Sequence, residues 1–260
     1  MRELLEEMHA WMSAYMKSFY TEDAEVQNGI EKKEKHTEMV MCHCMDLARN
    51  LKLSEHDCQL AEMIGLFHDV GRFRQYTIYR TFNDALSEDH AELGLKVLSE
   101  QSFVDKLPAE DKEILYFAIS NHNKKEIAPT EDERKLLLAR IIRDADKLDI
   151  YRVLEPFLTG DTMEKAPNFI QGIAGQEISP DFMELFAAGQ QADYHRIRTH
   201  GDRKLVRLLW VYDISFAWTM QRIVEKGYLD KIIASLSPVN EKLQMGIDKL
   251  WEHVRRKCSE

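Results

Sequence analysis

Residues that break helices are rare along this chain, and their scarcity constrains the fold more than any other feature. The 260 residues include only 11 Gly and 6 Pro, and few runs show the period-2 alternation that predicts strands. We therefore expect an all-α fold. Hydrophobic periodicity and capping signals predict helices at about 2–20, 31–50, 55–68, 88–100, 109–122, 131–145, 147–157, 180–188, 202–226 and 239–257.

Two stretches are expected to be irregular. One runs from Arg72 to Asp84, and the other, from Gly160 to Pro180, is richer in Gly, Pro and polar residues. The second stretch is the better candidate for a domain boundary. A chain of this length lies near the upper limit for one hydrophobic core, so we expect a helical domain over residues 1–158. A C-terminal helical subdomain over residues 159–260 would pack on this domain or cap it.

The charge balance limits the partners that this protein can bind. Its net charge is -10 at pH 7, which argues against binding to duplex nucleic acid through neutralisation of phosphates. An acidic protein can still bind a small anion where metal ions and a few Arg or Lys side chains reverse the sign locally. With 44% hydrophobic and 31% charged residues, the chain has the composition of a globular protein.

Cysteine usage and hydropathy favour a cytoplasmic location. The four cysteines, Cys42, Cys44, Cys58 and Cys258, form no Cys-x-x-Cys pair, which indicates reduced thiols and argues against a structural zinc site. Residues 1–20 carry charges at intervals typical of an amphipathic helix and not of a signal peptide. No stretch approaches the ~20 uninterrupted apolar residues of a membrane span, so we expect no membrane association.

Two residues that commonly bind metals stand at the end of a predicted core helix. Apolar residues recur with helical spacing from Leu60 to Phe67, and this helix runs directly into His68 and Asp69. Neighbouring side chains of a helix diverge by about 100 degrees, so an adjacent His and Asp converge on one point only near a helix end or through a bridging carboxylate. The position of this doublet is therefore typical of a metal centre.

Further residues of this kind lie on separate predicted helices. His36 comes upstream, directly after Lys35, and the stretch Asp-Ala-Asp-Lys-Leu-Asp at 144–149 follows the apolar run Leu136–Ile142. A lone His-Asp doublet arises easily by chance among 10 His and 45 acidic residues. Three helices that each present such residues make a metal site the better interpretation.

Two arginines close to the doublet are candidates for phosphate binding, whereas the charge runs elsewhere are not. Gly71 lets the backbone turn sharply, and Arg72 and Arg74 follow as cations that can meet phosphate oxygens. The short charge runs Glu31–Lys35 and Arg255–Lys257 are interpreted as solvated helix ends.

The order of these residues resembles the ligand pattern of the HD superfamily of metal-dependent phosphohydrolases: a His, then a His-Asp doublet, then a distant Asp. The resemblance covers residues 30–155 and implies an HD-type helical bundle. It also implies four metal ligands, namely His36, His68, Asp69 and Asp146. Asp144 is the main rival for the last position. If Asp146 binds the metal, Asp144 instead orients a ligand or water, and Lys147 contacts phosphate.

Residues 68–94 also resemble a branch of this superfamily, mostly bacterial proteins of unassigned function, in which Arg follows the Gly of His-Asp-x-Gly. In binuclear members two more histidines bind metal, and His90 and His122 fit their places. Asn121 stands where some relatives have another His. The resemblance therefore leaves open whether one or two ions bind.

The implied chemistry is hydrolysis by water activated on a divalent metal, without a protein nucleophile. Imidazole and carboxylate ligands without thiolate suit Mn, Fe, Ni, Co, Mg or Zn. The water would be held by one ion, or by two together with Asp69, and the cations Arg72, Lys147 and Lys124 would stabilise the phosphoryl oxygens. The expected substrate is a phosphate ester or anhydride of a small molecule, with nucleotides as the leading class.

Two other functions stay open. An HD-like domain can serve as a non-catalytic regulatory or ligand-binding module, although all four principal ligands are present here. A di-iron oxygenase is the third option, because His90 and His122 could complete a second iron site. The long C-terminal helices are compatible with a homodimer.

Overall fold

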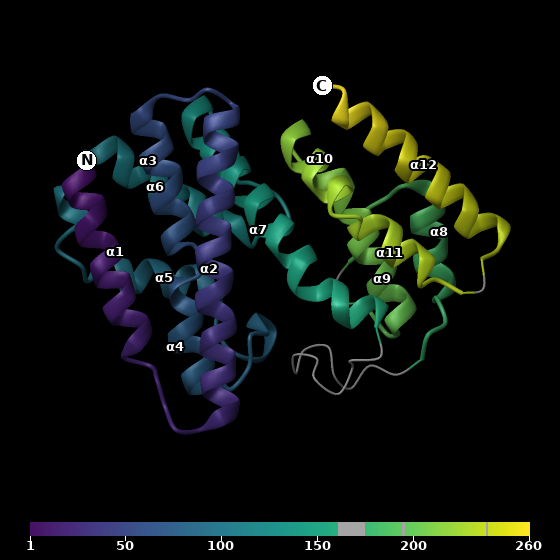
Figure 1. Ribbon diagram of the computed structural model, residues 1–260, viewed down its shortest axis with the longest axis horizontal. Coiled ribbons are helices and arrows are strands. Elements are labelled where there is room, and N and C mark those ends of the chain that lie inside the picture. Colours follow the sequence, from purple (N-terminus) through teal and green to yellow (C-terminus); the bar gives the residue numbers. More distant parts are fainter. Residues whose placement is uncertain (161–174, 194–195, 238) are drawn as a thin grey trace. The chain divides into compact units, whose positions relative to one another are not determined.

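The computed structural model describes residues 1–160, 175–193, 196–237 and 239–260. Within these ranges every regular element is a helix (Figure 1), which confirms the expected all-α fold. The chain divides into two compact units, Met1–Asp149 and Ile150–Glu260. The division falls inside α7 (Glu133–Thr159), a single helix where the sequence predicted two. Most of the predicted irregular stretch from Gly160 to Pro180, residues 161–174, lies outside the described residues.

The first unit is a bundle of helices. Its elements before α7 are α1 (Arg2–Lys17), α2 (Ala24–Asn50), α3 (Glu55–Phe67), α4 (Val70–Tyr79), η1 (Asp84–Leu86), α5 (His90–Ser99), η2 (Val104–Lys106) and α6 (Ala109–His122). Side-chain caps fix several starts. Asp23 accepts hydrogen bonds from the backbone of Glu25 and Val26, so α2 begins earlier than the predicted residue 31. Asp89 caps α5 by accepting hydrogen bonds from the backbone of Ala91 and Glu92.

Helix α3 forms the centre of this unit. Its residues Leu60, Met63, Ile64 and Phe67 are all buried, and the helix packs against α2, α1 and α6. Gly65 permits the close approach of α2, since a Cβ atom there would lie 2.7 Å from the Cα atom of Met41. The buried stripe predicted from the sequence therefore holds the end of α3 in a fixed position.

Helix α4 corrects one prediction. The stretch from Arg72 to Asp84 was expected to be irregular, yet α4 extends to Tyr79 and ends only at Arg80, which has φ 55°. Val70, Phe73 and Tyr76 are buried at a spacing of three, so packing of an apolar face stabilises a helix that lacks a side-chain cap.

The second unit follows the first along the chain. It contains the end of α7, then α8 (Pro180–Ala188), α9 (His200–Leu209), η5 (Trp210–Asp213), α10 (Ala217–Glu225), α11 (Tyr228–Ala234) and α12 (Glu241–Cys258). The single helix predicted at 202–226 is wrong, because η5 and the extended backbone of Phe216 interrupt it. Helix α11 was not predicted. It begins after Gly227, whose φ of 67° suits a residue without Cβ.

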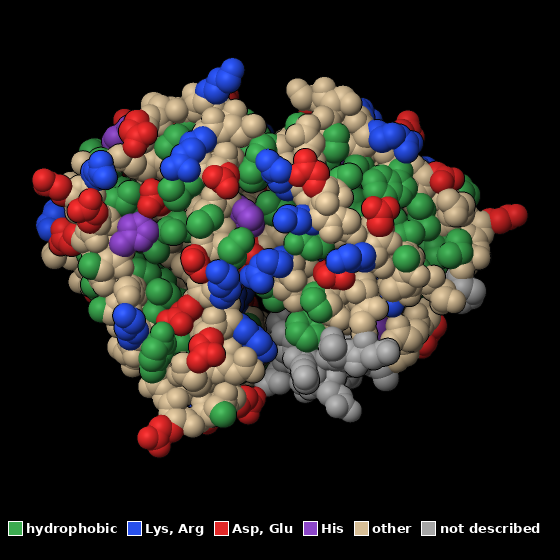
Figure 2. Space-filling view, in the orientation of Figure 1, with side chains coloured by type: hydrophobic (Ala, Val, Ile, Leu, Met, Phe, Trp, Pro, Cys, Tyr) green, Lys and Arg blue, Asp and Glu red, His purple; other side chains and the backbone are tan. Residues whose placement is uncertain are grey.

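The surface carries both signs of charge. On the face drawn in Figure 2, Lys and Arg side chains are interspersed with Asp and Glu side chains. None of the helices in the described ranges is long and apolar enough to cross a membrane.

Candidate metal centre

The His-Asp doublet lies where one helix ends and the next begins. Helix α3 ends at Phe67, His68 is its C-cap residue, and Asp69 is the N-cap residue of α4. Because the chain changes direction between these two residues, their side chains converge instead of diverging along one helix. Both are buried, with 0% and 3% of their surface exposed.

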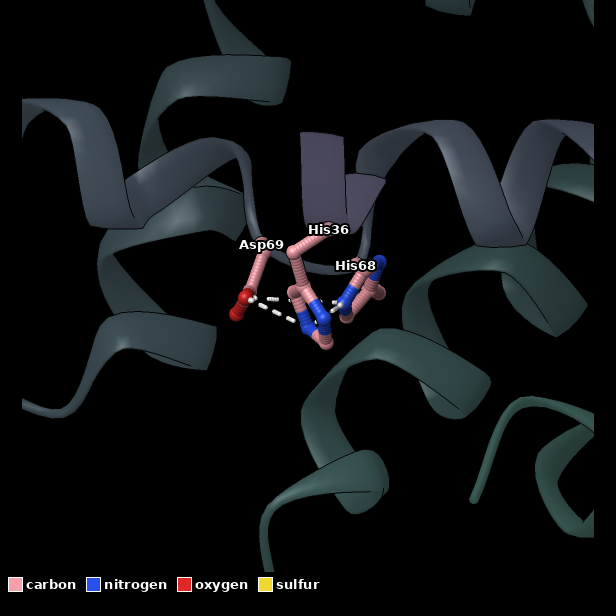
Figure 3. Close-up of side chains that lie close together, drawn as sticks. All are labelled: His36, His68 and Asp69. Atoms are coloured by element: carbon pink, nitrogen blue, oxygen red, sulfur yellow. Dashed lines mark hydrogen bonds and ion pairs between the residues drawn. The ribbon is translucent and has the colours of Figure 1, made fainter. Parts of the chain in front are cut away.

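Four side chains form the first cluster. His36 comes from α2, His68 and Asp69 from the junction of α3 and α4, and Asp146 from α7. The Nε2 atom of His36 lies 3.1 Å from Oδ1 of Asp146 and 3.4 Å from Oδ2 of Asp69. The Nε2 atom of His68 lies 3.4 Å from Nε2 of His36, 3.5 Å from Oδ2 of Asp69 and 3.9 Å from Oδ1 of Asp146. Figure 3 shows three of these side chains pointing toward one another. Residues far apart in the sequence thus meet at one point.

A second cluster uses the other oxygen of Asp69. Oδ1 of Asp69 lies 3.3 Å from Nε2 of His90 on α5 and 3.7 Å from Nε2 of His122 on α6. The two imidazoles are 2.9 Å apart at their Nε2 atoms. Asp69 is therefore shared, with one oxygen in each cluster.

The donor atoms of both clusters fit divalent ions. An ion with ligands at about 2.1 Å sets neighbouring ligand atoms about 3.0 to 3.5 Å apart, close to most of the separations above. His36, His68 and Asp69, and likewise Asp69, His90 and His122, are buried groups that could each hold an ion. Imidazole with carboxylate and no thiolate suits Mn, Fe, Co, Ni, Zn or Mg and does not select one of them.

The outer nitrogen of every histidine in the centre has an acceptor. The Nδ1 contacts are Asp149 Oδ2 for His36 (2.7 Å), the Gly65 carbonyl for His68 (2.8 Å), Asp84 Oδ2 for His90 (2.6 Å) and the Ile119 carbonyl for His122 (2.7 Å). When Nδ1 donates to these oxygens, Nε2 presents its lone pair to the centre. The four imidazoles are thus oriented as metal ligands.

Burial and charge favour the protonation states that bind metal. Burial lowers the pKa of His68 to about 4 and that of His90 to about 3, so both are neutral near pH 7. Burial alone would raise the pKa of Asp69, but the charge of Lys33 holds it well below its usual range. Burial also opposes ionisation of Asp146, yet its hydrogen bond with His36 lowers its pKa. Both carboxylates are therefore ionised.

On α7, Asp146 contacts His36 in the first cluster. Residues two apart on a helix point about 200 degrees away from each other, and Asp144 is fully buried on that helix. Asp149, three residues beyond Asp146, shares its face and accepts the hydrogen bond from His36. Asp149 therefore gives His36 a supporting contact of the kind that the sequence analysis considered for Asp144.

Arg72 is tied into the second cluster. Its Nη1 atom donates to Gln75 Oε1 at 2.8 Å, the Phe82 carbonyl at 2.6 Å and Asp84 Oδ1 at 2.7 Å. Its Nε atom lies 3.5 Å from Oδ1 of Asp69. The guanidinium group therefore stands beside the centre and also holds Asp84, the residue that orients His90.

The other predicted phosphate-binding cations differ in position. Arg74 is exposed on the opposite side of α4 from Arg72, so the structure does not bring it to the centre. Its charge lies near Tyr15, where it only partly opposes the burial that raises the pKa of this tyrosine to about 12. Lys124 pairs with Asp89, the residue before His90. Lys147 is half-buried on α7 directly after Asp146.

Asn121 does not serve as a seventh ligand. Its Nδ2 atom donates to the Phe117 carbonyl at 2.8 Å, and its Oδ1 atom accepts the backbone N–H of Ala128 at 2.7 Å. Buried Arg143 donates to the carbonyls of Asn121 and Lys124. The Asn side chain thus closes the loop after α6 instead of joining the second cluster.

Gly71 sets the distance between α4 and α5. A Cβ atom there would lie 2.3 Å from the His90 carbonyl oxygen and 2.6 Å from the Gly94 nitrogen. Only a residue without a side chain permits this contact, which brings His90 up to Asp69. The glycine after the doublet therefore serves a close approach rather than a sharp turn.

Two contacts of the centre were missed from the sequence. Lys33 lies within the run Glu31–Lys35 that was interpreted as a solvated helix end, yet its Nζ atom is 2.6 Å from Oδ2 of Asp69. For Lys33 that interpretation is wrong. Asp84 supports His90 from a stretch interpreted as irregular. The signal for Lys33 was its spacing, three residues before His36 on the same helix face.

An all-helical unit with two such clusters around a shared carboxylate defines a metal-binding helical domain. A family model described as the HD domain matches residues 34–151, a range that includes every residue of both clusters. Residues 34–151 are therefore an HD domain, which is an all-α fold, and the buried His and Asp side chains within it could bind a divalent metal. No curated protein and no solved structure matches the chain.

Proposed function

We propose that this protein is a metal-dependent phosphohydrolase that cleaves a phosphate ester or anhydride of a small molecule by attack of water. The observation that carries the proposal is the position of Asp69, whose two oxygens face separate clusters of metal-binding groups. A divalent ion held there lowers the pKa of a bound water to about 7 and polarises phosphoryl oxygens.

The side chains of the centre have separate tasks in this reaction. Ionised Asp69 and Asp146 and the neutral imidazoles supply the ligand set. Arg72, Lys147 and Lys124 supply positive charge for the phosphoryl oxygens, and the anchored Nη1 atom of Arg72 limits the movement of its guanidinium group. We assign Asp144 an indirect role, as a buried group on the helix that carries Asp146.

The proposed substrate class is nucleotides, and it rests on the likeness to the HD superfamily together with the charge of the chain. A net charge of -10 disfavours long nucleic acids but allows a small anion at a locally positive site. We also propose a cytoplasmic location and no stable membrane partner, in line with the four free cysteines.

The test begins with the metal content of the purified full chain, measured by elemental analysis. The protein is then stripped, reloaded with each divalent ion in turn, and assayed for phosphate release from nucleoside monophosphates, nucleoside triphosphates, cyclic nucleotides and dinucleoside polyphosphates. We expect turnover with at least one ion and one substrate group. Metal retention with no release from any substrate would favour the non-catalytic module. Oxygen consumption by the iron-loaded protein, without phosphate release, would favour the di-iron oxygenase.

A further inference from the structure

Lys33 is a cation placed inside a site for cations. It lies on α2 one turn before His36, and its Nζ atom is 2.6 Å from Oδ2 of Asp69, the oxygen that faces the first cluster. Its side chain is only 18% exposed. The ammonium group also stands 5.3 Å from the centre of the Phe82 ring. Lys33 is thus a largely buried residue of the centre that is paired with Asp69, and not a solvated surface residue.

This position has an electrostatic consequence. An ion bound to Oδ2 of Asp69 at about 2.1 Å lies within about 5 Å of the Lys33 nitrogen. Like charges this close repel each other, so Lys33 weakens metal binding unless an anion lies between them. Asp69 alone cannot fully serve as that anion, because its single negative charge is shared between both clusters.

The hydrogen-bonding capacity of Lys33 indicates which kind of anion would lie between it and the metal ion. An ammonium group has three N–H donors, and among the described residues the contacts of Lys33 are one carboxylate oxygen and one ring face. Oδ2 of Asp69 has a second lone pair for a metal, so the ion pair and metal binding are compatible. The remaining N–H donors can then meet an oxygen atom of an anion bound beside the ion.

We propose that Lys33 is a phosphate-binding residue of the metal centre, which binds a non-bridging phosphoryl oxygen of the substrate next to the first cluster. The identification of the anion as a phosphoryl group rests on the proposed function. Arg72 lies beside Oδ1 of Asp69 and Lys33 contacts Oδ2, so these two cations flank the shared carboxylate. A tetrahedral anion with several charged oxygens is the ligand that can meet both cations and the ions together.

The experiment uses the full chain loaded with its metal, and inorganic phosphate as the probe in calorimetric titrations. Lys33→Met removes the ammonium group and keeps most of the apolar stem. We expect it to weaken phosphate binding by about tenfold or more, the usual value of a hydrogen bond to a charged group, and to raise the KM of any substrate more than it lowers kcat. Lys33→Arg keeps the charge and should retain most of the affinity for phosphate.

Lys35→Met is the matched control. Lys35 lies on the same helix, its side chain is 56% exposed, and it pairs with Glu38. This variant makes the same change in net charge without a contact in the centre. It should bind phosphate as the wild type does.

A second titration separates phosphate binding from mere support of Asp69. Metal is added to the stripped protein in the absence of phosphate, and Lys33→Met should bind it as tightly as the wild type or more tightly, since a repulsive charge is gone. Weaker metal binding by this variant, or unchanged phosphate affinity, would overturn the proposal. Wild-type protein that binds metal but no phosphate would overturn it too. Failure of the proposed function has a different signature, namely phosphate binding that depends on Lys33 without turnover of any ester.

Discussion

The two halves of the metal centre are built differently around the same carboxylate. The first half has two imidazoles and two carboxylates, and Asp149 supports His36. The second half has two imidazoles and only its share of Asp69, and Asn121, next to His122, closes a loop and adds no ligand. Arg72 and Asp84 form an ion pair beside this half. Lys33 places a positive charge beside the first half, but the additional carboxylate of Asp146 would contact the ion directly, so we expect this half to hold its ion more tightly.

When both halves bind metal, this difference predicts one ion that is resident and one that exchanges more readily. A ligand set with one less carboxylate binds a divalent cation more weakly, all else being equal. Activity could then depend on the metal concentration through the second half alone. Variants that affect both halves, one half, or only the outer contacts of one half test this comparison.

The largest effect is expected from Asp69→Ala, because both clusters share Asp69 as a ligand. Each half loses a ligand, so we expect loss of bound metal and a fall in turnover of about 10³-fold or more, given the several kcal/mol that a metal supplies to the transition state. Elemental analysis and phosphate release measure the two outcomes. Asp46→Ala, at an exposed position on α2, is the control. Asp69→Ala protein with two ions and wild-type turnover would remove this residue from the mechanism.

The next largest effect separates the two halves. His36→Ala removes a ligand of the first half and His90→Ala one of the second. We expect the first variant to lose most of its metal, since the better half is damaged. The second should retain close to one ion per chain, with its activity restored in part by excess metal. Metal titrations followed by calorimetry give both stoichiometries. Equal retention by the two variants would mean that the halves are equivalent.

Some of this arrangement was predictable because it depends on local order in the sequence. The apolar stripe from Leu60 to Phe67 identified a core helix that ends at His68, and the helix does end there. His36, His68, Asp69 and Asp146 meet as the ligand pattern implies. The helix end follows from hydrophobic spacing, and the set of four ligands follows from the resemblance to the HD superfamily, whose order of His, His-Asp and Asp can be read in the sequence.

Other features depend on tertiary packing and were not visible. The charged run around Lys33 has the composition of a solvated helix end, and only the packing of α2 against α3 brings this lysine to Asp69. Likewise, nothing in the sequence distinguishes Asp149 from Asp144, because both are acidic residues on the same helix. The rotation of that helix decides which of them faces His36.

A smaller effect is expected from the residues that support the ligands. Asp149→Asn weakens the hydrogen bond to His36, and Asp84→Asn weakens the one to His90. Each change should lower metal affinity about 10- to 100-fold, in the first half for Asp149→Asn and in the second for Asp84→Asn. Calorimetric titration of the stripped variants measures both. If Asp84→Asn weakened the tighter site, the assignment of Asp84 to the second half would be wrong.

The smallest effect is expected from lowering the pH, which should weaken metal binding by the first half. Although burial and Lys33 lower the pKa of His36, its hydrogen bonds with Asp146 and Asp149 raise it above the ordinary value. Near and below neutral pH a proton therefore occupies His36 in the metal-free protein, and the metal must displace it. The pKa of His90 is about 3, so that residue carries no such proton between pH 5 and 8.

Affinity of the first half should consequently fall as the pH is lowered through the neutral range, by at most about tenfold per pH unit for one proton. The contribution of His90 to the second half should stay constant over the same range. Metal titrations at pH 8, 7 and 6 on Asp84→Asn and Asp149→Asn protein separate the two sites, because each variant weakens one. Asp149→Asn also weakens a contact that raises the pKa of His36, so the metal affinity of the first half should depend less on pH in this variant. If the metal affinity of the first half were unchanged from pH 8 to pH 6, His36 would hold no proton in the metal-free protein over this range. The two carboxylates of the first half would then make it the tighter site at every pH tested.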